Sequence, residues 1–159
     1  MDDRQEAVNF IRYRLEFEEA MLALHRSAIE GFNLGMSQQE DEADLKAISQ
    51  IYLDSGGEFL LGFLGERLVA MGGFKRISNE LVELRRMRIA TDLQGRGYGT
   101  LLLRELEQRA LKSGARMVCL DTARRRPLTL EFYRRHGYQE TGSSYYGTVE
   151  TVQFSKELR

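Results

Sequence analysis

The chain has 159 residues, of which 42% are apolar and 30% are charged, and its formal net charge at pH 7 is −1. This composition excludes a disordered chain, and the near-neutral charge argues against a general nucleic-acid binder. Its longest apolar stretches are too short to span a bilayer, so no membrane partner is expected. We expect one domain over residues 1–159 with a single core.

Cysteine use indicates a reducing environment. Cys119 is the only cysteine, so no disulfide can form within the chain, and the expected compartment is the cytoplasm. It lies in the apolar run 117–120, where a buried small hydrophobe is expected rather than a nucleophile.

Charge is unevenly distributed along the chain. The N-terminal third holds a cluster of acidic residues, namely Glu16, Glu18, Glu19, Glu40, Asp41, Glu42 and Asp44. The later part is rich in arginine, at Arg85, Arg86, Arg88, Arg96, Arg116, Arg124, Arg125 and Arg126. Two interpretations stay open: both sets are solvated faces, or the basic half faces a polyanionic cofactor.

The N-terminal part predicts one strand and two helices. Residues 4–14 alternate weakly and indicate a strand. Residues 16–32 carry Ala20, Leu24 and Ala28 at helical spacing, with His25 expected to be packed or solvated on that helix. A second helix is expected at 38–53, ended by residues 55–57.

Three strands at short spacing follow, at residues 58–64, 68–75 and 81–89. Turns at 65–66 and 78–79 predict an antiparallel meander. In the third strand Val82 and Leu84 share one parity, whereas Met87 and Ile89 have the other. A one-residue β-bulge near Arg85 and Arg86 would bring all four apolar residues to one face; the alternative is a regular strand with both arginines at an edge.

The last third predicts a helix at 100–111, a strand at 116–121, a helix at 127–136 and closing strands at 138–142 and 145–154. The 116–121 strand is expected to be covered on both faces because it is apolar from 117 to 120. Gly114 and Gly137 are expected to end the two helices. The fold class is therefore α+β, with a mixed, mostly antiparallel central sheet flanked by helices.

A glycine-rich loop joins the 81–89 strand to the next helix. Gly95, Gly97 and Gly99 stand at alternate positions, so main-chain N–H groups can approach a ligand closely. They lie at a helix N-terminus, where unpaired donors favour an anion, which predicts a pyrophosphate cradle. The spacing does not meet the Gly-x-Gly-x-x-Gly dinucleotide fingerprint, and the Gly-Lys-Ser/Thr of a Walker loop is absent.

This loop, in this order of elements, resembles the GNAT superfamily of N-acetyltransferases from about Val8 to Leu158. The family's acyl-CoA signature, Gln/Arg-x-x-Gly-x-Gly/Ala, is matched in full by Gln94-Gly95-Arg96-Gly97-Tyr98-Gly99. A strand ending in Met-Arg-Ile precedes it, and Phe132-Tyr133-Arg134-Arg135-His136-Gly137-Tyr138 resembles the family's Phe-Tyr-x-x-x-Gly-Phe element.

The resemblance implies transfer of an acetyl group from acetyl-CoA, the expected co-substrate, to a primary amine by direct attack, with no metal. It implies that the Met87 N–H polarises the acetyl carbonyl and that Tyr133 is the general acid for the leaving thiolate, the alternative for Tyr133 being packing. Glu83 is the candidate base, with an ion pair to Arg85 as its alternative. The implied cofactor-binding residues are Met87, Arg88, Ile89, Gln94, Gly95, Arg96, Gly97, Tyr98, Gly99, Thr100 and Arg126.

Two positions depart from the family pattern. Arg126 stands where the family usually has an Asn that bonds the pantetheine arm, although one of Arg124, Arg125 and Arg126 could reach the ribose phosphate. Thr91 stands where the family often has Pro. These departures keep open a non-catalytic acyl-CoA sensor on the same fold, and a donor such as succinyl-CoA is a third possibility.

The acceptor is expected to be a small-molecule or peptide amine. Two N-terminal helices, the loop 31–39 and the turn 143–148 would shape its site, and their acidic residues favour a cationic amine such as a polyamine, an amino acid or a peptide N-terminus. Members of the family often form homodimers, so the resemblance allows either a homodimer or a monomer.

Overall fold

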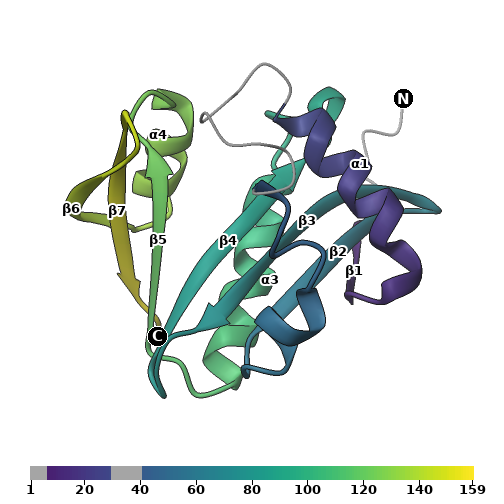
Figure 1. Cartoon of the computed structure of the whole chain (residues 1–159), viewed down its shortest axis with the longest axis horizontal. Helices are drawn as coiled ribbons and strands as arrows, with labels where there is room; N and C mark the ends of the chain where they lie inside the picture. Colours follow the sequence, from purple (N-terminus) through teal and green to yellow (C-terminus); the bar gives the residue numbers. More distant parts are fainter. Residues whose placement is uncertain (1–6, 30–40) are drawn as a thin grey trace.

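The computed structural model describes residues 7–29 and 41–159. They form a seven-stranded sheet in the order β1-β2-β3-β4-β5-β7-β6 (Figure 1). Its strands are β1 Asn9–Arg12, β2 Glu58–Leu64, β3 Arg67–Arg76, β4 Leu81–Ile89, β5 Met117–Ala123, β6 Gln139–Tyr146 and β7 Val149–Glu157. Only β4 and β5 pair in parallel. The predicted α+β class with a mostly antiparallel sheet is confirmed.

Helices cover both faces of the sheet. Within the described part of the chain these are α1 Glu18–Ala28, α3 Tyr98–Lys112 and α4 Pro127–Arg135, with the 3₁₀ turns η1 Leu15–Phe17 and η3 Thr91–Leu93 and the π-helical turn η2 Ser49–Leu53. Helix α1 packs on β3 and β4 on one face, while α3 packs on β2, β3 and β4 on the other (Figure 1). None of these helices is long and apolar enough to cross a lipid bilayer.

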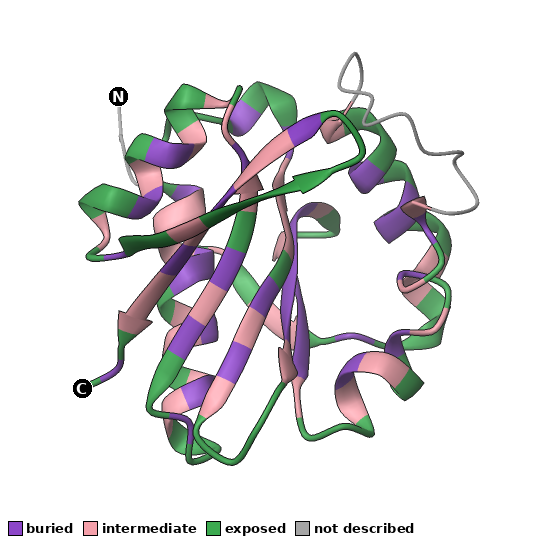
Figure 2. Ribbon diagram, turned by 60° about the vertical axis from the view of Figure 1, so that its left-hand side comes forward, coloured by how far each residue is buried: buried purple, intermediate pink, exposed green. Residues whose placement is uncertain are grey.

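Burial differs between the strands (Figure 2): most of β2 and β3 is buried continuously, the first halves of β4 and β5 alternate, and the edge strand β6 is exposed. Helix α1 buries Met21, Leu22, Leu24 and His25, while Ala20 is exposed. The apolar face is therefore rotated slightly from the predicted one. His25 is fully buried, so the option that it is solvated is wrong.

The helix predicted at 38–53 is confirmed at its C-terminal end and wrong before it. Residues 42–46 form turns, whereas residues 48–53 are helical and include the π-helical turn η2, in which the Asp54 N–H donates to the Ser49 carbonyl. Residues 38–40 lie outside the described residues, as do 4–6 of the predicted first strand and 30–32 of the predicted first helix. Asp41, Glu42 and Asp44 bind cationic side chains on other elements, and these tertiary contacts outweigh local helix propensity.

Strand β5 is not covered on both faces as predicted. Val118 and Leu120 are buried, whereas Met117 is 42% exposed and Cys119 is only half-buried. Met117 and Cys119 still pair with β4, but α1 covers this face only over β3 and β4, so the second face of β5 carries no packed helix among the described residues. Burial raises the pKa of the Cys119 thiol to about 11, so the thiol is protonated at neutral pH and is a poor nucleophile.

Candidate active site

The glycine-rich loop leads into the N-terminus of α3. Gly95 and Gly97 have φ values of +77° and +90°, and Gly97 is the N-cap residue, with no side chain capping the helix. The Gln94 Nε2 donates to the Ile89 carbonyl at 3.2 Å, which ties the loop to the end of β4. The first N–H groups of a helix have no partner within it, so those of α3 are available to an anion.

A β-bulge interrupts β4 beside this loop. Met71 pairs with Arg88 and Gly73 with Arg85, so Arg86 and Met87 together lie opposite Gly72. Arg86 has a φ of +63°, in the left-handed region that costs a non-glycine residue free energy. The bulge predicted from the change of apolar phase is therefore confirmed.

The sheet splits on the other edge of β4. Strand β4 pairs with β5 only from Leu81 to Glu83, and the two strands diverge beyond that point (Figure 1). From Leu84 to Ile89 this edge of β4 has no strand partner in the described sheet. The split holds a cavity of about 600 Å³, lined by Met87, Ile89 and the glycine loop on one side and by Phe132 and Tyr133 of α4 on the other.

An ion-pair network outside the sheet holds the bulge. The Arg86 guanidinium contacts Asp41 Oδ1 at 3.2 Å and Asp44 Oδ1 at 2.6 Å. His25 Nε2 lies 2.8 Å from Asp41 Oδ2, and the Tyr52 hydroxyl donates to Asp44 Oδ2 at 2.6 Å. Backbone strain of this kind costs about 1–3 kcal/mol, and the paired, partly buried carboxylates offset it.

Tyr133 reaches the bulge from α4. It is 8% exposed, and its hydroxyl lies 3.6 Å from the Met87 sulfur. Burial raises the pKa of Tyr133 to about 12, although the nearby positive charges of Arg88 and Arg126 act in the opposite direction. The phenol is therefore protonated at neutral pH and able to donate a proton.

Two carboxylates stand at the start of the split. Glu83 forms an ion pair with Arg85, which is the structural alternative to a role as base. Asp121, on β5, lines the same cavity. The pKa of Asp121 is raised, first by burial and then by the negative charge of Glu83.

Among the basic residues of the second half, Arg126 is the one of the three consecutive arginines that lines the cavity. Arg124 instead pairs with Glu140 and Glu150, both at 2.8 Å, and Arg125 is exposed. Arg96 is exposed within the loop. Thr100 Oγ1 lies 2.9 Å from His136 Nε2, which joins the start of α3 to the end of α4.

The structure thus brings Glu83, Met87, Arg88, Ile89 and Tyr133 together with the glycine loop around one split. Sequence reasoning missed the contacts of Asp41 and Asp44 to Arg86 in the bulge, since pairs more than 40 residues apart leave no local pattern. It also missed Asp121. The one available signal was a charged residue directly after an apolar strand.

Comparisons with known proteins agree on one family. The profile of the acetyltransferase (GNAT) family matches residues 18–138. No curated protein sequence matches the chain significantly.

Several solved structures share the fold. An acetyltransferase of the GNAT family from Staphylococcus aureus Mu50 has a TM-score of 0.85 at 23% identity, over 96% of this chain and 100% of that one. An acetyltransferase from Streptococcus agalactiae 2603 has a TM-score of 0.85 at 16% identity, over 97% and 99%. The PaiA N-acetyltransferase from Thermoplasma acidophilum, in complex with coenzyme A, has a TM-score of 0.72 at 19% identity, over 92% and 98%. Because the family profile spans more than half of its length, the chain belongs to the GNAT acetyltransferase family.

Proposed function

We propose that this protein transfers the acetyl group of acetyl-CoA to a primary amine in a ternary complex. The observation that carries the proposal is the split between β4 and β5, with a bulged strand, an uncapped helix N-terminus and a buried phenol around one cavity. The main-chain N–H groups on this edge of β4 are free to bind an acyl-CoA, because no neighbouring strand of the described sheet takes their hydrogen bonds.

The groups around the cavity suit the chemistry of the coenzyme. No atom lies within 4 Å of a Cβ built on Gly95, so the glycine faces open space. The N–H groups of residues 95–100 suit the diphosphate, with Arg96 and Arg126 adding positive charge. The unpaired edge of β4 near Ile89 suits the amides of the pantetheine arm.

Each chemical task has a candidate group. The amine nitrogen forms a bond to the thioester carbon, and the Met87 N–H stabilises the negative charge on the carbonyl oxygen. Glu83, through water, accepts the proton that the amine loses. When the C–S bond breaks, the thiolate takes a proton from Tyr133, which the buried site keeps protonated.

A thermal melt with acetyl-CoA tests the binding part of this proposal. At a hundredfold excess over its dissociation constant, a ligand of the folded state adds about 2.7 kcal/mol to the free energy of unfolding. We expect a clear upward shift of the melting temperature with acetyl-CoA and with coenzyme A. A melting temperature unchanged by millimolar ligand would contradict the proposal.

A non-catalytic acyl-CoA sensor is the second candidate, and one observation favours it. Glu83 already pairs with Arg85, so the only candidate base on β4 is partly neutralised. A sensor would be stabilised by acyl-CoA yet would release no thiol from it with any amine. Comparing thiol release from acetyl-CoA and from succinyl-CoA in the same assay shows which of the two is the acyl donor.

A further inference from the structure

Two cavities meet in the split between β4 and β5. The one of about 600 Å³ extends to the glycine loop, and a second of about 400 Å³ extends to Tyr145 and Tyr146 on β6. Both are lined by Arg85, Arg86 and Arg88 of β4 and, across the split, by Asp121 and Arg126. We call these residues the shared wall of the two cavities. A second substrate that enters from the β6 side would meet the thioester there.

The bulge decides which side chains form that wall. Glu83 and Arg85 share a face of β4 because they are two residues apart. The extra residue of the bulge then turns Arg86 and Arg88 to this face and leaves Met87 packed against Gly72 and α3. Three of the four charges are matched within the protein: Glu83 with Arg85, and Arg86 with Asp41 and Asp44.

Arg88 is the exception. Its Nη1 donates to the Met87 carbonyl at 2.9 Å, while its Nε is buried and has no hydrogen-bond partner within residues 7–29 and 41–159. The pKa of Arg88 is lowered to about 10, first by burial and then by the positive charges of Arg86 and Arg126, so it remains protonated at neutral pH. A buried cation with no carboxylate partner among the described residues and an unpaired Nε is costly, which points to a ligand that supplies an anionic group.

The anion that fits Arg88 is not the coenzyme's diphosphate. The diphosphate belongs at the glycine loop, and the pantetheine arm separates it from the thioester. Arg88 directly follows Met87, the residue whose N–H is assigned to the thioester carbonyl. An anionic group on Arg88 is therefore within a few bonds of the attacking nitrogen.

The same cavity offers a complementary site for an ammonium group. Glu83 and Asp121 both line it, and burial, followed by the negative charge of Glu83, raises the pKa of Asp121, although Arg85 acts in the opposite direction. A positive group between the two carboxylates relieves their mutual repulsion. The wall thus presents carboxylates and an unmatched guanidinium to one small molecule.

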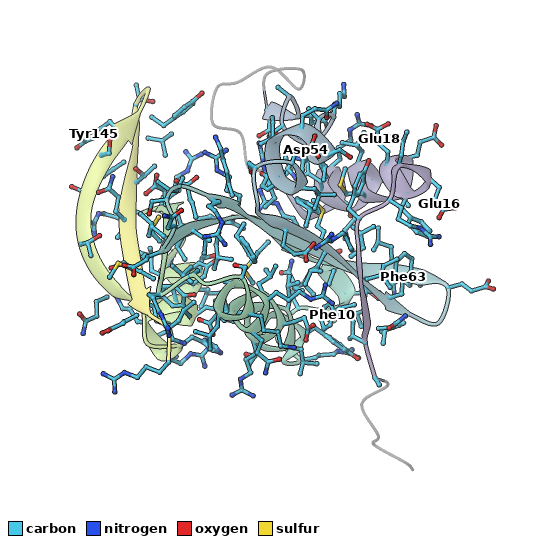
Figure 3. All side chains as sticks on the ribbon, turned by 90° about the horizontal axis from the view of Figure 1, so that it is seen from below. Phe10, Glu16, Glu18, Asp54, Phe63 and Tyr145 are labelled. Atoms are coloured by element: carbon cyan, nitrogen blue, oxygen red, sulfur yellow. The ribbon has the colours of Figure 1, made fainter. Side chains whose placement is uncertain are left out.

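We propose that the acceptor is a free amino acid, with its carboxylate bound by the Arg88 guanidinium and its ammonium group directed to Glu83 and Asp121. This inference rests on the proposed N-acetyltransferase function and narrows its acceptor. It disfavours a polyamine, which has no anionic group. The acidic residues that favoured one are engaged elsewhere: Asp41 and Asp44 bind Arg86, and Glu42 binds Arg26. Glu16, in the turn η1 before α1, lies on the opposite side of the molecule from Tyr145 of β6 (Figure 3).

The test compares each of the common L-amino acids with its own α-carboxamide as an acceptor, by release of thiol from acetyl-CoA. The amide keeps the side chain and amine but lacks the carboxylate, and its amine is less basic, so more of it is free to react. We expect kcat/KM for the preferred acid to exceed that for its amide by about tenfold to a hundredfold, the range of a charge-assisted bond to a desolvated cation.

Variants assign the preference to Arg88. Arg88→Gln is expected to reduce the ratio of kcat/KM between acid and amide to about one. Arg88→Lys keeps the positive charge but lacks the two parallel N–H donors of a guanidinium, so its ratio is expected to be intermediate. Arg104→Gln is the matched control, because Arg104 is exposed on α3 and lines neither cavity of the split. Melting temperatures with coenzyme A show that each variant is folded and still binds the cofactor.

The outcomes separate the inference from the proposed function. Equal turnover of acids and amides overturns the inference while N-acetyltransferase activity stands. An acid preference that survives in Arg88→Gln overturns the role of Arg88. If no acceptor releases thiol, the melt of the coenzyme A complex with each acid and amide decides: the inference expects stabilisation by acids only, and its absence overturns the inference.

Discussion

The two sides of the split offer different groups to a ligand. The side proposed to bind the coenzyme presents main-chain groups, exposed by glycines and by an unpaired strand edge. The side proposed to bind the acceptor presents charged side chains that the bulge in β4 brings to one face. Main-chain recognition tolerates changes of sequence around a short motif, whereas side-chain recognition can differ from one family member to the next. We therefore expect the features of the coenzyme site to be shared across the family and those of the acceptor site to differ between its members.

The largest expected effect comes from Tyr133, which lies between the two sides. Tyr133→Phe removes the proton donor but keeps the ring contacts with Phe132, Tyr138 and Phe154. We expect kcat to fall about a hundredfold or more, with little change in the melting-temperature shift caused by coenzyme A. A steady-state assay measures this, and an unchanged kcat would leave Tyr133 with a packing role only.

The bulge connects the two sides, and Arg86 tests it. Arg86→Ala and Arg86→Gly both remove the contacts to Asp41 and Asp44, but only glycine accepts a φ of +63° without strain. We expect kcat to fall on the order of tenfold in both, because the Met87 N–H loses its fixed position. Denaturant unfolding should show Arg86→Ala to be less stable than Arg86→Gly by about 1 kcal/mol.

An Arg86→Ala variant as stable as Arg86→Gly would show that the positive φ is not retained in the variant. A wild-type kcat in both variants would show that the contacts of Arg86 to Asp41 and Asp44 do not position the Met87 N–H.

The coenzyme side can be tested alone with a matched pair of glycines. Gly95 and Gly65 both have positive φ values, +77° and +58°, and a Cβ at either would meet no atom within 4 Å. Gly95→Ala and Gly65→Ala should therefore destabilise the fold similarly, by about 1–2 kcal/mol. Only Gly95→Ala should weaken coenzyme A binding in calorimetry, by about tenfold, since only its Cβ enters the cradle. Equal affinities in the two variants would contradict the cradle.

The smallest effect concerns pH and the buried His25. Burial lowers the pKa of His25 despite its hydrogen bond to Asp41, so below about pH 6.5 the unfolded chain takes up a proton that the folded chain does not. The contribution of His25 to the free energy of unfolding should have its full value above about pH 6.5. It should decrease as the pH falls from there toward the pKa of His25 in the folded state. His25→Gln should lack this slope, and a slope unchanged in the variant would assign it to another group.

Local patterns predicted most of the coenzyme side. The change of apolar phase between Val82–Leu84 and Met87–Ile89 revealed the bulge, and Pro127 and Gly137 marked the limits of α4 within about one residue. These features follow from local sterics and periodicity, which a sequence displays directly.

The acceptor side could not be predicted in the same way. The unmatched state of Arg88 depends on which carboxylates its neighbours take, and Arg86 takes its partners from 42 and 45 residues away. The turns at 42–46, where a helix was predicted, have the same origin, because Asp41 and Asp44 are held by ion pairs to Arg86 on β4. The spacing of apolar residues along the sequence does not indicate which distant charged residues pair.

The central claim is that main-chain amides around one split hold the acyl-CoA. An NMR titration of ¹⁵N-labelled protein with coenzyme A and then acetyl-CoA tests it most directly. We expect the amides of Gly95, Gly97, Gly99 and Ile89 to shift with both ligands, and that of Met87 to shift further when the acetyl group is present. Saturable binding that leaves these amides unmoved while shifts appear elsewhere would contradict the account.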